Sequence, residues 1–171
     1  MTHAQASPPA EPNVPAPQPP GAKSKRFWRA FWLTFLVGSL AYAWHSFYVP
    51  SNSIAWADSY TAAQEQAVES DKPVILFFTG AWCVPCRIMK REVWADDEVA
   101  DAVHADFIPV LIDVDDPDAT AVVSRYRIGV TPTTIIADPQ GEVLRYEQGG
   151  LSKASFLELL AGPDSAASEE L

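Results

Sequence analysis

Cysteine and histidine are scarce in this chain, and their scarcity excludes most of the sites that these residues build. The 171 residues include two cysteines, Cys83 and Cys86, and three histidines. Two cysteines three positions apart form neither the disulfide framework of a small secreted domain nor a set of zinc ligands. A disulfide across so small a loop restricts the unfolded chain little, by roughly 2 kcal/mol in the loop-entropy model. The pair therefore indicates chemistry rather than stapling.

Basic residues are scarce in the larger part of the chain. Residues 50–171 carry eight Lys and Arg against 21 Asp and Glu, whereas residues 1–49 carry four basic residues and one acidic residue. A strongly acidic surface repels phosphate backbones and keeps a domain soluble. Nucleic acid is therefore excluded as a partner.

Charge is absent from a long stretch near the N-terminus. Residues 30–49 contain no Asp, Glu, Lys or Arg, and twenty helical residues span about 30 Å, one bilayer core. Aromatic residues near both ends are typical of membrane interfaces, and basic residues before the stretch predict a cytoplasmic N-terminus. We therefore predict a single-pass transmembrane helix over 30–49 in a bacterial-type inner membrane, with everything after it periplasmic or otherwise extracytoplasmic. The aromatic residues are Trp28, Trp32, Trp44 and Tyr48, and the basic residues are Lys23, Lys25, Arg26 and Arg29.

Short segments flank the predicted membrane helix and the domain that follows it. Seven of the fourteen residues 7–20 are proline, so residues 1–29 are expected to form a disordered, proline-rich and basic tail. Residues 50–55 are expected to be a linker, and residues 163–171 a disordered acidic tail. A cleaved signal peptide is the alternative, because Ala55-Trp56-Ala57 resembles a cleavage site, although the apolar region exceeds the usual ~7–15 residues. Both interpretations place the domain outside the cytoplasm.

Residues 56–162 alternate between helical and strand patterns. The apolar runs 74–78 and 107–114 predict buried strands, and 133–137 and 142–148 predict two further strands joined by a turn. Trp56, Tyr60, Ala63 and Ala67 recur at helical spacing and predict a helix that ends at Lys72-Pro73. The pattern predicts further helices from Cys83 onwards, over 96–105, over 118–126, and over 152–160 with Ser152 as cap. Because strands separated by helices imply parallel pairing and the terminal hairpin adds an antiparallel edge, we expect an α/β fold with a mixed sheet covered on both faces.

Cys83 and Cys86 lie where a buried strand gives way to a helix. The unpaired backbone N–H groups and the positive dipole end of a helix N-terminus favour a thiolate. Cys83 is therefore the expected nucleophile, and Cys86, one turn further along, is the expected resolving residue. The positive charges of Arg87, Lys90 and Arg91 would favour the thiolate if they lie close, or they belong to a solvated helix face.

Three motifs carry a resemblance to a known family. Trp82-Cys83-Val84-Pro85-Cys86 follows a buried strand, Thr131-Pro132 precedes a later strand, and Gly149-Gly150 precedes the last helix. Together they resemble the thioredoxin superfamily over residues 56–162. The stretches 72–83 and 92–96 look most like the thioredoxin-like domains of extracytoplasmic thiol:disulfide interchange proteins.

The resemblance implies a fold, an activity and site residues. It implies a thioredoxin fold and a protein dithiol-disulfide oxidoreductase that needs no bound cofactor, with a redox-active disulfide between Cys83 and Cys86. It implies a cis peptide at Thr131-Pro132 and a role for Trp82, Thr131 and Pro132 in positioning an extended protein substrate. Val84, Pro85 and Arg87 would modulate the cysteines.

Two positions depart from the cytosolic members of this superfamily, which typically pair a buried Asp with a Lys on the next strand. Here the corresponding residues are Phe77 and Leu111. Losing both charges avoids an unpaired buried charge but removes the proton acceptor that assists the resolving thiol. We hypothesise that proton transfer then runs through water or substrate, and that resolution by Cys86 is slower.

The direction of electron flow is constrained by the dipeptide between the cysteines. Strong oxidants of this type usually have a histidine there, and this chain has Val84-Pro85, which favours a reductase. A reductase outside the cytoplasm needs a membrane or extracytoplasmic electron donor, since that compartment is kept oxidising.

Two functions of other classes stay open. One is a membrane-tethered protein-binding or chaperone-like module that uses the groove around Pro132. The other is a copper metallochaperone that holds Cu(I) between the two thiolates. Covalent haem attachment requires His directly after the second cysteine, and Arg87 excludes it. A run of aspartates lacks the glycine and terminal Glu of a known calcium loop, so we interpret it as a solvated strand end: Asp113, Asp115, Asp116 and Asp118.

Overall fold

The computed structural model describes residues 22–162, and side chains from residue 25 onwards. The predictions for residues 1–21 and for the tail 163–171 lie outside this range. Backbone contacts divide the chain into two compact units between Ser46 and Phe47, and each is described by itself.

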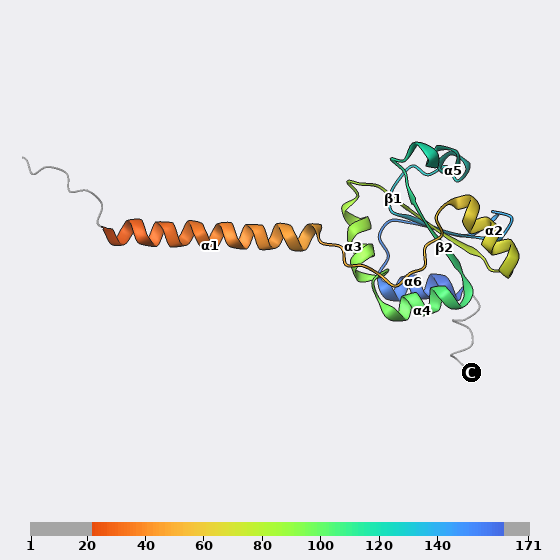
Figure 1. Cartoon of the computed structure of the whole chain (residues 1–171), viewed down its shortest axis with the longest axis horizontal. Coiled ribbons are helices and arrows are strands. Elements are labelled where there is room, and N and C mark those ends of the chain that lie inside the picture. The colour runs from red at the N-terminus through yellow and green to blue at the C-terminus, as the bar shows by residue number, and fades with distance from the viewer. Residues whose placement is uncertain (1–21, 163–171) are drawn as a thin grey trace, which may run out of the picture. The chain divides into compact units, whose positions relative to one another are not determined.

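The first unit contains one helix, α1 (Ala22–Phe47), drawn at the red-to-orange end of the chain in Figure 1. It begins before the predicted span 30–49 and ends two residues short of it. Large aromatic side chains line it one turn apart, with Trp28 and Trp32 in edge-to-face contact at 5.9 Å. Over residues 22–162, no helix combines the length and hydropathy of a membrane span. The predicted transmembrane helix is therefore not confirmed.

The second unit has the element order that the sequence predicted. The helices are α2 (Tyr60–Ser70), α3 (Val84–Glu92), α4 (Asp97–Asp106), α5 (Thr120–Arg125) and α6 (Lys153–Ala161), with a 3-10 turn, η1 (Pro117–Ala119), before α5. The strands are β1 (Val74–Thr79), β2 (Ile108–Asp113), β3 (Thr133–Ala137) and β4 (Val143–Gln148). Ser152 caps α6 as predicted, accepting a hydrogen bond from the Ser155 N–H at 3.2 Å.

Helix α2 starts later than the apolar spacing suggested. Ser59 caps it by accepting a hydrogen bond from the Ala62 N–H, and the chain before Ser59 is extended, with Ala57 bridging to Val110 of β2. Trp56 therefore lies before the helix, so its assignment to the helical stripe was wrong. Its ring packs instead on Trp94, with centroids 4.7 Å apart. The Ser59 cap and the Ala57–Val110 bridge therefore set the start of α2, and the spacing of apolar residues does not.

The sheet has the order β2-β1-β3-β4 and is mixed, as predicted. β1 and β2 are parallel, whereas β3 is antiparallel to both β1 and β4. The parallel pairing expected for strands separated by a helix was therefore wrong for β3. The six-residue helix α5 spans about 9 Å, less than a strand of about 20 Å, and the rest of the connection does not carry the chain back along the sheet. After α5, the chain enters β3 at the same end of the sheet at which it left β2, with Thr133 opposite Phe78 of β1.

Helices cover both faces of the sheet (Figure 1), and β1 forms its buried centre. Ile75 and Phe77 face a cluster formed with α3, α4 and α6, which includes Cys86 and Trp94. Val74, Leu76 and Phe78 face a second cluster formed with α2 and α5. The edge strand β4 differs, because no residue in it is buried and the apolar Val143 and Leu144 are about half exposed.

Gly141 closes the β3–β4 hairpin, and a side chain there should destabilise the domain. Its φ is +84°, and an added Cβ would lie 2.7 Å from Arg125 Nη2 and 2.8 Å from the Tyr60 hydroxyl. Both groups are held in place, because Arg125 donates to the Gly141 carbonyl and the Tyr60 hydroxyl is hydrogen-bonded to the Tyr126 hydroxyl. We expect Gly141→Ala to lower the free energy of unfolding by at least about 1 kcal/mol, measured by urea denaturation. Gly129→Ala, where no atom lies within 4 Å of the added Cβ, is the control and should change it by less than about 0.5 kcal/mol.

An ion pair joins the starts of α4 and α6 and should make stability depend on pH. Lys153 Nζ lies 2.8 Å from Asp96 Oδ1 and 2.7 Å from Glu98 Oε2, and the Lys153 hydrogen bond lowers the pKa of Asp96. The ion pair should therefore stabilise the fold fully above the unfolded Asp pKa of about 3.9. This stabilisation should be lost as the pH falls through the lower pKa that Asp96 has in the folded protein.

Asp96→Asn isolates this charge, because asparagine can still cap α4 as Asp96 does. The variant should be less stable than the parent at pH 7 and equally stable near pH 2, and 1 M salt should reduce the difference at pH 7. A difference that stays constant from pH 7 to pH 2 would show that packing, not charge, is responsible.

Candidate functional site

The cysteine motif is positioned by a buried strand and a capped helix. β1 ends at Thr79, residues 80–82 turn, and α3 begins at Val84 with Cys83 as its N-cap and Pro85 in its first turn. Proline is tolerated there because the first helical N–H groups have no intrahelical partner. Cys83 Sγ instead accepts a hydrogen bond from the Cys86 N–H at 3.2 Å. The sulfur therefore sits where a helix N-terminus favours negative charge.

Cys83 and Cys86 form a disulfide with Cα atoms 5.2 Å apart. The two residues differ in exposure: Cys86 is 1% exposed and belongs to the core cluster, whereas Cys83 is half-buried at its margin. In the described residues there is no free cysteine. The Cys83 sulfur is therefore easier for another molecule to reach than the Cys86 sulfur.

Two loops lie beside the motif. The peptide bond Thr131–Pro132 is cis, as predicted, and Pro132 is buried. The Pro132 carbonyl accepts a hydrogen bond from the Gly149 N–H at 2.8 Å. A Cβ placed on Gly150 would lie 3.8 Å from Pro85 Cβ. The Gly149-Gly150 turn therefore connects the cis-proline loop with the start of α3.

Exposed apolar side chains surround the disulfide. Trp82 is 87% exposed, and Val84, Ile88 and Val130 are each exposed by more than 40%. They come from the turn before α3, from α3 itself, and from the loop before Pro132. Apolar groups exposed around a reactive bond are typical of a surface that binds other proteins.

A family model for the thioredoxin-like domain matches residues 60–162. The chain belongs to this family. Over 100 residues it is 33% identical to thioredoxin from Alicyclobacillus acidocaldarius subsp. acidocaldarius, a match that covers 56% of this chain and 90% of that protein. Over 94 residues it is 33% identical to the thiol:disulfide interchange protein DsbD of Ralstonia nicotianae, covering 54% of this chain but 15% of the longer relative.

A solved structure resembles the same region. The oxidised C-terminal domain of Neisseria meningitidis DsbD superposes with a TM-score of 0.51 and 26% identity, over 61% of this chain and 94% of that domain. With the Cys83–Cys86 disulfide in place, the thioredoxin-like domain is assigned to the thiol-disulfide oxidoreductases.

Phe77 and Leu111 are paired in the thioredoxin-like domain, as the resemblance required. They are register partners on β1 and β2. Phe77 is fully buried, with its ring 5.2 Å from that of Trp94, whereas Leu111 is 36% exposed. The position that would hold a buried carboxylate is therefore filled with hydrocarbon.

Asp115 has a structural role that the sequence interpretation missed. Its Oδ2 accepts a hydrogen bond from the Ala81 N–H at 3.1 Å, and a Cβ on Gly80 would lie 3.4 Å from the same oxygen. Asp115 therefore holds the turn that leads into Trp82 and Cys83. The signal in the sequence was an aspartate directly after a strand, but only the parallel pairing of β1 and β2 places it beside this turn.

Lys90, one of the three basic residues expected either to favour the thiolate or to lie on a solvated helix face, is not fully solvated. It lies on α3, one turn after Cys86, and is half-buried. Desolvation lowers the pKa of Lys90, and the charge of Asp113 partly opposes that shift. Arg87, which was predicted to modulate the cysteines, is half-buried, and among the described residues its Nε is buried without a hydrogen-bond partner.

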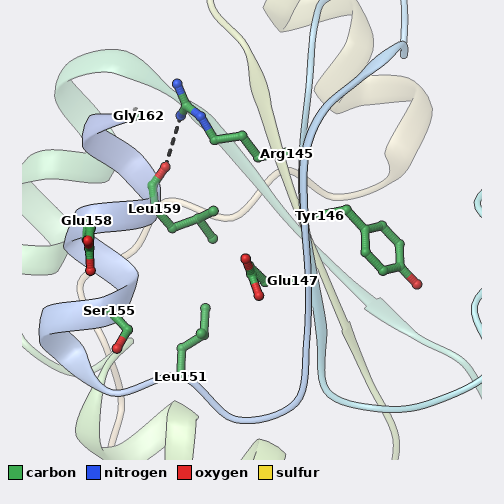
Figure 2. Close-up of a pocket in the computed structure, with 8 residues that line it drawn as sticks. All are labelled: Arg145, Tyr146, Glu147, Leu151, Ser155, Glu158, Leu159 and Gly162. Atoms are coloured by element: carbon green, nitrogen blue, oxygen red, sulfur yellow. Dashed lines mark hydrogen bonds between the residues drawn. The ribbon is translucent and has the colours of Figure 1, made fainter. Parts of the chain in front are cut away.

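A pocket of about 660 Å³ lies elsewhere, between β4 and α6. Figure 2 shows Arg145 reaching from β4 to donate a hydrogen bond to the Leu159 carbonyl of α6, at 2.9 Å, on one side of this space. None of the predicted site residues lines it; the lining residues are Arg145, Tyr146, Glu147, Leu151, Ser155, Glu158, Leu159 and Gly162. A disulfide that reacts with other proteins needs an exposed surface rather than a cavity.

Proposed function

We propose that the protein reduces disulfides of other proteins outside the cytoplasm, with Cys83 attacking and Cys86 resolving. The observation that carries this proposal is the difference in exposure between the two sulfurs at the start of α3. In the reduced protein, the Cys83 thiolate attacks a substrate disulfide, forms a mixed disulfide and releases one substrate thiolate. Cys86 then attacks Cys83 Sγ, the second substrate thiolate leaves, and the Cys83–Cys86 disulfide remains, so two electrons pass to the substrate.

The neighbouring residues position the substrate. Trp82, Thr131 and Pro132 border the path along which an extended segment would approach Cys83. Val84 and Pro85 occupy the first turn of α3, and with Arg87 they tune the stability of the thiolate. The exposed Trp82, Val84 and Val130 supply the apolar contacts.

The reduction potential tests the direction of electron flow. The full chain contains no cysteines besides this pair, so equilibration with glutathione or dithiothreitol buffers followed by alkylation and mass spectrometry reports one couple. We expect a potential below about −200 mV, within the range of reductases. A value near −120 mV would make the protein an oxidant, and cysteines that never form a reversible disulfide would exclude exchange altogether.

We also propose that residues 30–49 tether the domain to the inner membrane, with the N-terminus cytoplasmic and the electron donor in or beyond the membrane. The proposal rests on the uncharged stretch within α1 and on the basic residues that precede it. It predicts that the full chain stays in the membrane fraction after alkaline carbonate extraction, and that a variant lacking residues 22–49 is released. Release of the full chain under the same conditions would contradict the tether.

A protein-binding module without exchange activity is the second candidate, favoured by the exposed apolar side chains around Cys83. The two functions differ in what they require of the thiols. Binding alone should survive Cys83→Ser, whereas exchange should not. Pull-down of protein clients by the parent and by this variant separates them.

A further inference from the structure

Lys90 lies on the same side of α3 as the buried resolving cysteine. Residues four apart on a helix are neighbours, with Cβ atoms about 5–6 Å apart, so Lys90 follows Cys86 by one turn. Helical side chains also lean towards the helix N-terminus, which for α3 is the end that carries the disulfide. A lysine at position 90 is therefore expected to extend towards the end of α3 that carries the cysteine pair.

The charge that acts on Lys90 belongs to Asp113, at the C-terminal end of β2. Asp113 influences Lys90 electrostatically, and Asp113 is the register partner of Thr79, the last residue of β1 and four residues before Cys83. Asp113 Oδ1 also accepts a hydrogen bond from the Asp115 N–H, which fixes the carboxylate. Lys90 therefore interacts with a carboxylate at the end of the sheet where the cysteine motif begins.

Among the charged residues near the cysteine motif, Lys90 is the one suited to accept a proton from Cys86. Phe77, on the sheet face that contacts Cys86, is hydrocarbon. The other charged residues of α3 are unsuitable: Arg87 and Arg91 do not release a proton, and Glu92 is exposed and paired with Arg91. From the facing elements come Asp113, which interacts with Lys90, and Asp115, which holds Ala81. Among the salt bridges of residues 25–162, none involves Lys90.

Thr79 adds a polar group on the same side of the sheet. Side chains alternate along β1, so Thr79 shares the face of Ile75 and Phe77, whose cluster contains Cys86. Its hydroxyl is buried, and within residues 25–162 it has no hydrogen-bond partner. A hydroxyl can both donate and accept, so Thr79 can orient an amine or a thiol that approaches it.

We propose that the Lys90 amine accepts the thiol proton of Cys86 in the resolving step. The neutral amine takes the proton from Cys86 Sγ and becomes an ammonium, and the resulting thiolate attacks Cys83 Sγ. The bond between Cys83 and the substrate sulfur breaks, the substrate leaves as a thiolate, and that thiolate takes up a proton. Lys90 then returns its proton to solvent. The step rests on the exchange function proposed above and replaces water as the acceptor.

The partial burial of Lys90 supports this role. Desolvation lowers the pKa of Lys90 towards that of a thiol, which raises the fraction of neutral amine at neutral pH. A general base acts best when its pKa lies near the working pH. The charge of Asp113 partly opposes this lowering of the Lys90 pKa.

The two steps of exchange can be timed separately in the full chain. The reduced protein, which has two cysteines, is mixed with an equimolar amount of 5,5′-dithiobis(2-nitrobenzoate). The first chromophore released reports attack by Cys83, and the second reports resolution by Cys86, a first-order step whose product is the internal disulfide. We expect Lys90→Gln to leave the first phase unchanged and to slow the second by about 10²-fold at pH 7.

A matched control and a pH profile make the test specific. Arg91→Gln removes one positive charge from the neighbouring position of α3 and should not slow the second phase. Lys90→Arg keeps the charge but cannot accept a proton, so it should be as slow as Lys90→Gln. In both slow variants, the second phase should rise tenfold per pH unit up to the ordinary thiol pKa of about 8.5, because only the Cys86 thiolate then reacts.

Three outcomes would overturn the proposal. A second phase that is unchanged in Lys90→Gln would exclude Lys90. A parent-like rate in Lys90→Arg would assign the effect to charge rather than proton transfer. An equal loss in Arg91→Gln would assign it to the net charge of α3. Absence of the first phase in the parent protein would instead contradict the exchange function itself.

Discussion

Replacing Cys83 with serine is expected to lower disulfide exchange by at least about 10³-fold, because it removes the nucleophile on which both steps depend. The half-buried Cys83 is the sulfur that a substrate can reach, whereas Cys86 is 1% exposed. Stability should change little, since a disulfide over so short a loop restricts the unfolded chain weakly. Reduction of a protein disulfide, followed with the full chain, measures the effect.

Cys86→Ser is the matched control, since it removes the other half of the same disulfide. It should keep the attack by Cys83 and lose resolution, so a covalent mixed disulfide with the substrate accumulates. Mass spectrometry of the unreduced reaction identifies that adduct. If Cys86→Ser were inactive while Cys83→Ser formed the adduct, the assigned roles of the two cysteines would be reversed.

Phe77→Asp is expected to destabilise the domain by at least about 3 kcal/mol. Truncating a buried phenylalanine typically costs about 3–5 kcal/mol, and the ring of Phe77 is fully buried against Trp94. An unpaired carboxylate at the same place adds a desolvation penalty. Urea denaturation at pH 7 measures the loss, which should shrink at low pH as the carboxyl becomes neutral.

Adding Leu111→Lys should recover part of that loss. Phe77 and Leu111 are register partners, and Leu111 is 36% exposed, so a lysine there can reach the carboxylate and keep its head in water. We expect a coupling of about 0.5–3 kcal/mol in the double-mutant cycle, and Leu111→Lys alone to be nearly neutral. A coupling energy of zero would mean that the side chains at positions 77 and 111 do not interact.

The same double variant tests how the proton leaves Cys86. A carboxylate at position 77, on the face that contacts Cys86, offers a second acceptor. It should therefore speed the resolving phase near neutral pH and change its pH dependence. An unchanged pH profile would count against the hypothesis that the missing carboxylate limits resolution in this protein.

Local chemistry determined much of the fold in advance. Caps and periodicity predicted the element order, because Ser152 and Pro85 act through their own backbone positions. The predictions that were wrong concerned contacts between residues far apart in the sequence. Trp56 has helical spacing to Tyr60 but packs on Trp94, 38 positions later in the chain, and the direction of β3 depends on how far α5 can carry the chain.

The candidate site divides in the same way. By itself, the sequence determined that Cys83 and Cys86 lie at a strand-to-helix junction and that Phe77 replaces the buried Asp of cytosolic members. Through the family resemblance it also gave the expectation of a cis-proline. Each of these depends only on residue type at a fixed spacing. Tertiary structure alone decided that Asp115 holds the turn before Cys83 and that Lys90 faces Asp113 in a half-buried setting. Both depend on the parallel register of β1 and β2, which brings together residues more than twenty positions apart. The burial of an amine depends on tertiary packing and not on the neighbouring sequence.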